Sequence, residues 1–349
     1  MIDWLSLVVP MPHDAPISSG HVVSISPAGE VEWKTAKRRA VVGSFSTGLQ
    51  VRTATHTPDR CTHIEISGNP VKWFQGHNLW GTDDLPSLMV ATCQDVARLL
   101  GIEVSSCTLA AWQAGQVQIT RVDVTESFHL DNRAQVLSWL RAAEQTAHLS
   151  HRGRGQLVKG STLYFGKNSR RWSLKVYAKG QEIEAKGHGQ ESITDLPHAV
   201  AWADRTLRAE LTLRSLELKR IGLDQVTAWL PVDGVPFDVP ALLHKRLGDM
   251  TMTTTNHLSA EVIDTLRPAL RMAVQSWESG ADLRAMLTRA TFYRYRSELL
   301  PHGIDIATLQ PREALSNVVP LHRVLEAKPV GVPDWAQGTA LYFEPRRIA

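Results

Sequence analysis

The sequence predicts an α+β fold: a mostly antiparallel sheet with helices on one face, followed by a smaller, mainly helical C-terminal domain. Strand-like and helix-like patterns alternate over roughly the first 215 residues. The run PVDGVPFDVP, residues 231–240, has the Pro, Gly and Asp content of a linker, and beyond it the apolar residues recur with helical spacing. We therefore expect two domains, residues 1–230 and 236–349, as the length of 349 residues allows.

Local patterns predict the individual elements. The stretch HIEIS alternates apolar and polar residues as a strand does, and Asp131 or Asn132 is a suitable N-cap for the helix expected from about residue 131. In chain order the expected elements are an opening strand from Met1, strand 63–67, helix 84–100, strand 117–125, helix 131–148, the two strands within 161–184, helix 196–205, strand 207–214, and helices 241–247, 259–279 and 282–300.

Composition excludes several classes of protein. No apolar run approaches the ~18 residues of a membrane span, so we expect no membrane partner. The segment WLSLVV has no basic region before it and is typical of a strand rather than a signal peptide. Cys61, Cys93 and Cys107 have neither the number of a disulfide framework nor metal-ligand spacing, which indicates a reducing cytoplasm.

A basic block extends from His151 to Gln181. It contains no acidic residue, and Tyr164, Trp172 and Tyr177 are interleaved with its cations. The cations are Arg152, Arg154, Lys159, Lys167, Arg170, Arg171, Lys175 and Lys179. Cations suit phosphates and aromatic faces suit unstacked bases, so the block favours nucleic-acid binding over a merely solvated charge run.

The block includes a candidate nucleophile. In the second strand of the expected hairpin, Trp172, Leu174 and Val176 alternate with Ser173, Lys175, Tyr177 and Lys179. A tyrosine with a lysine two residues away on each side suits a phenolate that attacks a phosphate. The ammonium groups would favour the ionised phenol or hold the phosphoryl oxygens. The alternative is an amphipathic edge strand whose solvent face carries lysines.

Carboxylates occupy the polar faces of other expected strands. Glu65, Asp123 and Glu210 would converge on Tyr177 if these strands belong to one sheet, and they would then hold Mg²⁺ or Mn²⁺. The alternative is an exposed face with the pairs Arg121/Asp123 and Arg208/Glu210. In strand 117–125 the apolar residues switch from odd-numbered to even-numbered positions, which predicts a bulge or a polar end of the sheet. Glu182 would point to the opposite face if the tyrosine strand continued.

Several segments in one order resemble the gene-II family, the replication initiators of filamentous phages, from Met1 to the C-terminus. The segments are GNPVKWFQGHNLWGTDDL (68–85), ITRVDVT (119–125), the LYFG and RRWSLKVYAKGQE runs, LRAELTLR (207–214), NVVPLHR (317–323) and PDW (333–335). The resemblance implies a metal-dependent, site-specific DNA endonuclease and strand transferase of the host cytoplasm. Such an initiator nicks the supercoiled origin, stays joined to the 5′ end through a tyrosine, here Tyr177, and later circularises the displaced strand. Origin DNA, a host helicase and a host polymerase are the implied partners.

Some residues leave alternatives open. Other rolling-circle nickases bind their metal with a His-hydrophobe-His pair, and the sequence His63-Ile64-Glu65 favours a carboxylate-rich site instead. His77 could be a metal ligand, a DNA contact or a loop-stabilising residue. The expected DNA contacts are Lys72, His77, Lys167, Arg170 and Arg171.

The C-terminal run RATFYRYRSELLPHGIDI, residues 289–306, could contact DNA or form core. Two other functions compete with initiation: a non-catalytic origin-binding repressor on the same fold, and a relaxase or transposase with the same chemistry. The QGHN and NVVP runs favour the initiator over a relaxase or transposase.

Overall fold

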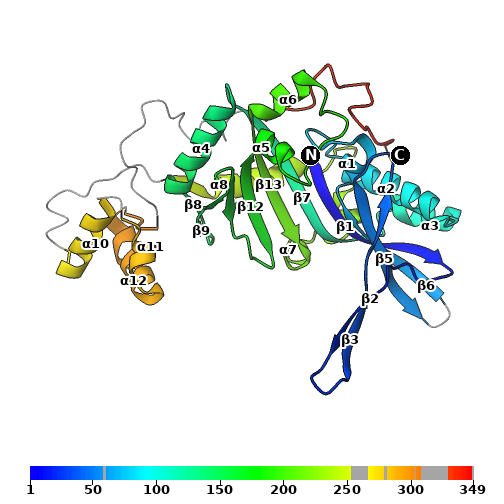
Figure 1. The fold of residues 1–349 in the computed structure, drawn as a ribbon, viewed down its shortest axis with the longest axis horizontal. Coiled ribbons are helices and arrows are strands. Elements are labelled where there is room, and N and C mark those ends of the chain that lie inside the picture. The colour runs from blue at the N-terminus through cyan, green and yellow to red at the C-terminus, as the bar shows by residue number, and fades with distance from the viewer. Residues whose placement is uncertain (58–59, 253–265, 279–280, 303, 308–328, 348–349) are drawn as a thin grey trace.

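A nine-stranded sheet, antiparallel throughout, forms the centre of the computed structural model (Figure 1). The structure describes residues 1–57, 60–252, 266–278, 281–302, 304–307 and 329–347. The strand order is β10-β11-β12-β13-β7-β1-β6-β5-β4. The strands are β1 (Ile2–His13), β4 (Arg39–Val42), β5 (Gly48–Thr57), β6 (Arg60–Gly68), β7 (Gln118–His129), β10 (Gln156–Val158), β11 (Thr162–Phe165), β12 (Trp172–Ala178) and β13 (Thr206–Arg214). The predicted α+β class with a mostly antiparallel sheet is confirmed.

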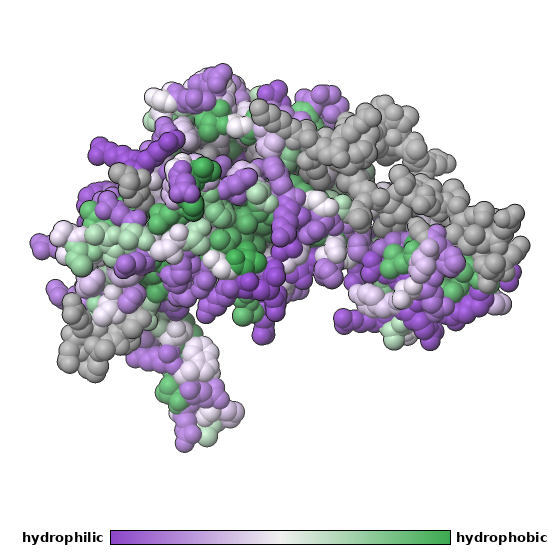
Figure 2. Space-filling view, turned by 180° about the vertical axis from the view of Figure 1, so that it is seen from behind, coloured by the Kyte–Doolittle hydropathy of each residue, from purple (hydrophilic) through white to green (hydrophobic). Residues whose placement is uncertain are grey.

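Helices cover the apolar face of this sheet. The helices α2 (Leu85–Leu100), α4 (Arg133–Thr146) and α8 (Val239–Gly248) share one core with the inward-facing strand residues. Asp84 and Asn132 cap α2 and α4 through their side chains, and Asn132 is one of the two N-caps that the sequence predicted. Seen from behind, the molecule shows a hydrophobic patch amid mostly hydrophilic residues (Figure 2).

The remaining elements of this unit are short. They are α1 (Pro70–Gln75), α3 (Ser106–Gln113), α5 (Lys179–Glu184), α6 (Pro197–Asp204), α7 (Ser215–Ile221) and the 3-10 turn η1 (Val226–Trp229). The strands β8 (Ala147–Leu149), β9 (Gly153–Arg154) and β14 (Met250–Met252) form a small second sheet. The strands β2 (His21–Ile25) and β3 (Val31–Ala36) form a two-stranded arm that projects from the body (Figure 1).

A bulge in β7 explains why the apolar residues of this strand switch from odd-numbered to even-numbered positions. Ser6 pairs with Arg121 but Leu7 pairs with Ile119, so Thr120 is an extra residue in β7. Ile119 and Val122 therefore both point into the core, although they are three residues apart.

Within the predicted C-terminal range of 236–349, the described helices divide between two cores. The helices α10 (Pro268–Glu278), α11 (Leu283–Met286) and α12 (Arg289–Leu299), with the turn η2 (Leu300–His302), form a core of their own beside β8 and β9 (Figure 1). Helix α8, by contrast, packs into the core of the sheet. The NVVPLHR run lies outside the described residues.

Residues 329–347, which we call the C-terminal strap, return to the first unit rather than joining the helices. The Val330 N–H donates to the Ser127 carbonyl, and Ala336 packs in a cluster with Trp80 and Trp202. Phe343 stacks on Phe74 with ring centroids 4.0 Å apart. Within the described ranges, no helix has the length and apolar content needed to cross a bilayer.

Candidate active site

Tyr177 lies near the end of β12, on the polar face of the sheet. Trp172, Leu174 and Val176 point into the core, while Ser173, Lys175 and Tyr177 point to the other face, so the predicted alternation is confirmed. The polar face is not a solvent face at this position, because only 3% of the Tyr177 surface is exposed.

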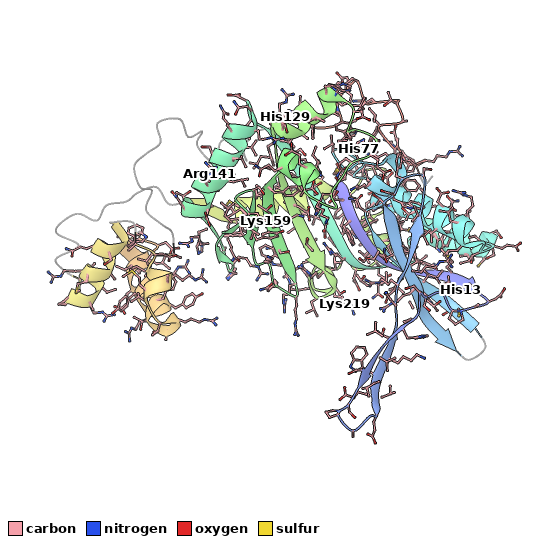
Figure 3. All side chains as sticks on the ribbon, viewed as in Figure 1. His13, His77, His129, Arg141, Lys159 and Lys219 are labelled. Carbon is pink, nitrogen blue, oxygen red and sulfur yellow. The ribbon has the colours of Figure 1, made fainter. Side chains whose placement is uncertain are left out.

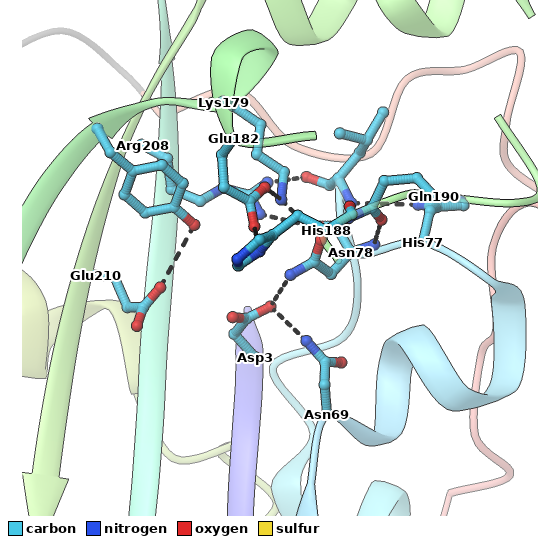
Figure 4. Close-up of polar contacts among 12 residues, drawn as sticks. Asp3, Asn69, His77, Asn78, Lys179, Glu182, His188, Gln190, Arg208 and Glu210 are labelled. Carbon is cyan, nitrogen blue, oxygen red and sulfur yellow. Dashed lines mark hydrogen bonds and ion pairs between the residues drawn. The ribbon is translucent and has the colours of Figure 1, made fainter. Parts of the chain in front are cut away.

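The tyrosine, a lysine and a carboxylate form the centre of the site. The Tyr177 hydroxyl donates to Glu210 Oε2 over 3.4 Å (Figure 4). Lys175 Nζ lies 2.9 Å from the same oxygen. Lys175 Nζ also lies 4.8 Å from the centroid of the Tyr177 ring. The register explains this grouping, since Lys175 pairs with Glu210 across β12 and β13, and Tyr177 is two residues further on the same face.

The electrostatics oppose an ionised phenol in this arrangement. Burial, followed by the nearby Glu210 charge, raises the pKa of Tyr177 well above its usual value. Burial also raises the pKa of Glu210, to about 7, despite the ion pair with Lys175. The expectation that two lysines would lower the tyrosine pKa is therefore wrong, because burial and the Glu210 charge raise it and both ammonium groups are bound to carboxylates.

Lys179 is not on the strand. β12 ends at Ala178 and α5 begins at once, so Lys179 turns inward and is fully buried. Its Nζ lies 2.7 Å from both Asn78 Oδ1 and Glu182 Oε2 (Figure 4). Burial lowers the pKa of Lys179 to about 8, whereas the Lys179 ammonium, against the effect of burial, lowers the pKa of Glu182 to about 2.

Glu182 is therefore part of the site, contrary to the expectation from a continued strand. A helix brings residues three apart to one face, which places Glu182 over Lys179. Gly180 permits this turn, because a Cβ there would lie 2.8 Å from the Asp204 Cα. His188 Nδ1 is 2.9 Å from the other Glu182 oxygen.

A polar network continues from Lys179 to the first strand. Asp3 Oδ1 accepts hydrogen bonds from the side-chain amides of Asn78, over 2.8 Å, and Asn69, over 2.9 Å (Figure 4). The buried Arg208 donates to the carbonyls of Asn78 and Leu79. The loop after α1 is thereby fixed beside Tyr177.

The QGHN run is a structural loop. Gly76 ends α1 with a φ of +80°, and a Cβ at this position would lie 2.7 Å from the Phe45 ring. His77 is fully buried, and its Nε2 donates to the Leu341 carbonyl over 2.8 Å while its Nδ1 accepts from the Leu79 N–H. Figure 3 shows His77 at the end of the sheet crossed by the C-terminal strap.

His77 has the loop-stabilising role, and the prediction that it contacts DNA is corrected by its burial. Burial lowers its pKa to about 4, so the imidazole is neutral at pH 7. Lys72, on α1, is half-buried and lies within electrostatic range of Glu182 and Asp3. It therefore remains a candidate phosphate contact next to the polar network.

The three predicted metal ligands share one face, but only Asp123 and Glu210 lie near each other, and Glu65 lies apart from both. Asp123 accepts two hydrogen bonds from Arg121, over 2.8 and 2.5 Å. Glu65 is bound by Arg52, over 2.7 Å, and by Arg38. The register places Glu65 opposite Val8 and Asp123 opposite Trp4, so roughly 13 Å of strand length and two inter-strand spacings separate them.

A divalent cation does not fit this arrangement as it stands. In the described part of the chain, no three His, Cys, Asp or Glu side chains are grouped so that they could hold a metal ion. The carboxylates within electrostatic range of one another are Asp3, Asp123 and Glu210, and each already has an amide or cationic partner. A metal would have to displace Arg121 from Asp123 and Lys175 from Glu210.

The predicted DNA contacts Lys167, Arg170 and Arg171 are exposed on the turn between β11 and β12. Arg171 is six residues from Tyr177, which corresponds to roughly 20 Å of extended strand. The basic turn and the tyrosine thus lie at opposite ends of one hairpin.

Sequence patterns did not indicate Asp3, Asn69, Asn78 or Glu182 as site residues. Arg208 lies two residues from Glu210 on the polar face of β13, and this alternation in the sequence is the one signal that could have assigned it to the site. The others are brought together by loops and by the strand-to-helix change at Ala178.

Comparison with known proteins agrees with the earlier resemblance. Residues 1–231 match the N-terminal family of the phage gene-II replication-associated protein, and residues 258–342 match the C-terminal family of the same protein. The replication-associated protein of Enterobacteria phage I2-2 is 39% identical over 352 residues, covering 100% of this chain and 99% of that protein. The replication-associated protein of Enterobacteria phage M13 is 24% identical over 324 residues, covering 78% of this chain and 76% of that protein.

Among solved structures, a rolling-circle replication initiator from Geobacillus stearothermophilus matches with a TM-score of 0.31 and 15% sequence identity. The match covers 74% of this chain and 88% of that one.

Proposed function

Because the chain belongs to the family of phage gene-II replication-associated proteins, we propose that it initiates rolling-circle replication by nicking origin DNA through Tyr177 and later rejoining the displaced strand. The observation that carries the chemistry is the Tyr177 hydroxyl donating to Glu210, at the end of a hairpin whose turn is basic. A phenol beside a proton acceptor and the Lys175 ammonium, with further cations along the same hairpin, suits attack on a phosphodiester.

Tyr177 Oη attacks the scissile phosphorus and passes its proton to the Glu210 carboxylate. A Tyr–O–P bond forms, the P–O3′ bond breaks, and the leaving 3′ oxygen takes up a proton to become a 3′-OH. Reversal of this step at the joined 5′ end by a later 3′-OH would close the displaced strand into a circle. The 3′-OH would prime a host polymerase while a host helicase unwinds the duplex in the host cytoplasm.

Each neighbouring cation has a proposed role. Lys175 lies beside both the phenol and Glu210, so it can stabilise charge on the phosphoryl oxygens as the proton leaves. Lys179 acts as a positioning residue, because it is fully buried and holds Asn78 and Glu182. Lys72, Lys167, Arg170 and Arg171 contact DNA phosphates.

The test is the covalent adduct. Supercoiled DNA that carries the origin of the encoding genome is incubated with protein and divalent cation, and protein–DNA adducts and nicked circles are measured. We expect Tyr177→Phe to abolish both and to retain DNA binding, because the ring is kept and only the nucleophilic oxygen is lost.

Tyr164→Phe is the matched control and should form the adduct normally. An adduct at Tyr164, or at any residue other than Tyr177, would contradict the assignment.

One observation favours the non-catalytic origin-binding alternative: Tyr177 is 3% exposed and its pKa is raised. A nucleophile in this state requires the side chains around its hydroxyl to move when DNA binds. A protein that binds origin DNA tightly and forms no adduct would support that alternative.

A further inference from the structure

A cleft runs between the helical unit and the nearby edge of the first unit. Three adjoining hollows, of about 510, 390 and 790 Å³, lie along it, and Arg284 of α11 lines all three. One wall comes from β9, β10 and β11 and their turns, and the other from α11 and α12. The Arg154–Asp282 ion pair, 2.9 Å long, joins the two walls.

The cleft is lined by cations in excess. Among the described residues, Arg152, Lys167, Arg284 and Arg289 line it without an ion pair to any acidic side chain. The acidic residues in the lining are Glu144 and Asp305, and Arg296 pairs with Asp305 over 2.7 Å. The excess of positive charge favours an anionic occupant.

Arg152 stacks on an aromatic ring beside the cleft. Its guanidinium carbon lies 4.2 Å from the Trp172 ring centroid, and that of Arg246 lies 4.4 Å from the same centroid. Its Nε is buried and has no hydrogen-bond partner in the described part of the chain. Arg152 also lines two of the hollows, so its guanidinium presents positive charge to a phosphate in the cleft.

Aromatic rings lie among these cations. Tyr164 and Tyr293 both line the cleft, Tyr293 is 43% exposed, and Lys167 Nζ lies 5.0 Å from the Tyr164 centroid. Exposed rings in a cationic channel bind unstacked bases, whereas a duplex keeps its bases stacked inside. The chemistry therefore favours a single strand.

The cleft also leads to the tyrosine. Tyr164 pairs with Lys175 across β11 and β12, and the neighbouring pair on that face is Thr162 with Tyr177. A DNA strand that leaves the cleft at Tyr164 would therefore pass close to Tyr177, because the two residues lie on the same face of the sheet and roughly 7 Å apart.

We propose that this cleft binds the displaced single-stranded DNA, with phosphates at Arg152, Lys167, Arg284 and Arg289 and bases stacked on Tyr164 and Tyr293. That the bound DNA is the displaced strand rests on the proposed function. The C-terminal helices would then hold that strand near the tyrosine. The aromatic and basic face of α12 then contributes to DNA binding as well as to the helical core.

The experiment measures binding of a fluorescent oligo-dT of about 16 nucleotides to the full-length chain by anisotropy at several salt concentrations. We expect Tyr293→Ala to weaken binding by about 5- to 100-fold, as the loss of one stacked base requires, and Tyr293→Phe to bind normally. Arg284→Gln should lower the slope of log affinity against log salt by about 0.7, the contribution of one phosphate contact on a single strand.

Arg98→Gln is the control for cation removal, because Arg98 is exposed on α2, far from the cleft (Figure 1). Thermal melts establish that each variant is folded. Unchanged oligo-dT affinity in an Arg284→Gln/Tyr293→Ala double variant would overturn the proposal. So would a loss confined to a duplex of the same length.

The adduct assay separates this inference from the proposed function. A chain that binds oligo-dT through these residues but forms no Tyr177 adduct keeps the cleft and refutes nicking. A chain that forms the adduct while the double variant binds oligo-dT normally refutes the cleft alone.

Discussion

Glu210 controls the state of Tyr177 at the scale of single residues. The carboxylate is buried among Lys175, Asp123 and Asp3, and its one hydrogen-bond donor besides Lys175 in the described residues is the phenol itself. When Glu210 is protonated it cannot accept the phenolic proton, so the tyrosine stays neutral. When Glu210 is ionised, the same geometry supports proton transfer during attack.

This coupling predicts a pH dependence of nicking. Glu210 is protonated below about pH 7 in the folded chain, so single-turnover adduct formation should rise as the pH increases through about 7. Glu210→Gln should lack this rise and should be slower by roughly 10²–10⁴-fold, the usual contribution of a general base.

Stability supplies an independent check. The pKa of Glu210 in the folded chain lies above the unfolded value of 4.5, so its contribution to stability falls as the pH rises from 4.5 to about 7. The Gln variant should lose that slope in thermal melts. If adduct formation by Glu210→Gln still rises with pH through about 7, another group accepts the phenolic proton.

The sequence-based expectation of Mg²⁺ or Mn²⁺ yields a separate prediction. Lys175 occupies Glu210 Oε2 in the described arrangement, so its ammonium competes with a cation. We expect Lys175→Gln to bind Mn²⁺ more tightly than the unaltered chain in a titration followed by electron paramagnetic resonance, and Glu210→Gln to bind it more weakly. Equal Mn²⁺ binding in all three proteins would exclude Glu210 as a ligand.

At the scale of elements, the change from β12 to α5 decides the composition of the site. Alternation along the strand correctly placed Lys175 and Tyr177 on one face, and the pairing of β12 with β13 then brought Glu210 to them. The same alternation failed at Lys179, because the chain becomes helical after Ala178. No local pattern marks that change, since it depends on Gly180 fitting against Asp204, a contact between residues 24 positions apart.

Long-range packing explains the other differences between sequence and structure. Asp3 stands in an apolar opening strand, and nothing near it in the sequence indicates that Asn69 and Asn78 bind its carboxylate. The burial of Tyr177 likewise depends on tertiary contacts that periodicity does not record. Helices α2 and α4 were predictable to within about two residues because their caps and apolar faces are local features.

The C-terminal strap gives an element-scale prediction. The Leu341 carbonyl accepts hydrogen bonds from both His77 and Trp80, each 2.8 Å long, so the strap stabilises the loop next to the active site. Removing residues 329–349 should lower the free energy of unfolding by at least about 3 kcal/mol, from hydrogen bonds of ~1 kcal/mol each and several uncovered aromatic and apolar side chains. Urea unfolding followed by tryptophan fluorescence measures the change.

A shorter deletion is the control for the strap. Arg346 and Arg347 are exposed, so removing residues 346–349 should leave the unfolding midpoint nearly unchanged. Equal stability of the two truncated chains would mean that the strap does not support the loop.

At the scale of the whole molecule, charge and chemistry are separated along one hairpin. The exposed cations of the β11–β12 turn lie roughly 20 Å from Tyr177, which corresponds to about six base-pair steps of duplex DNA. DNA that reaches the tyrosine would therefore be held by phosphate contacts several nucleotides from the scissile bond. This arrangement predicts that binding and chemistry can be altered independently.

The Arg170→Gln/Arg171→Gln double variant tests that separation. Both side chains are exposed on the turn, and loss of two phosphate contacts should lower the salt slope of duplex binding by about 1.8 and weaken affinity equally for origin and unrelated sequences. At saturating DNA the rate of adduct formation should stay within about twofold of the unaltered chain, because no atom near Tyr177 has changed. Arg346→Gln/Arg347→Gln, an adjacent exposed arginine pair on the C-terminal strap, is the matched control and should keep the full salt slope. An unchanged slope in the Arg170/Arg171 variant would place the duplex elsewhere on the surface.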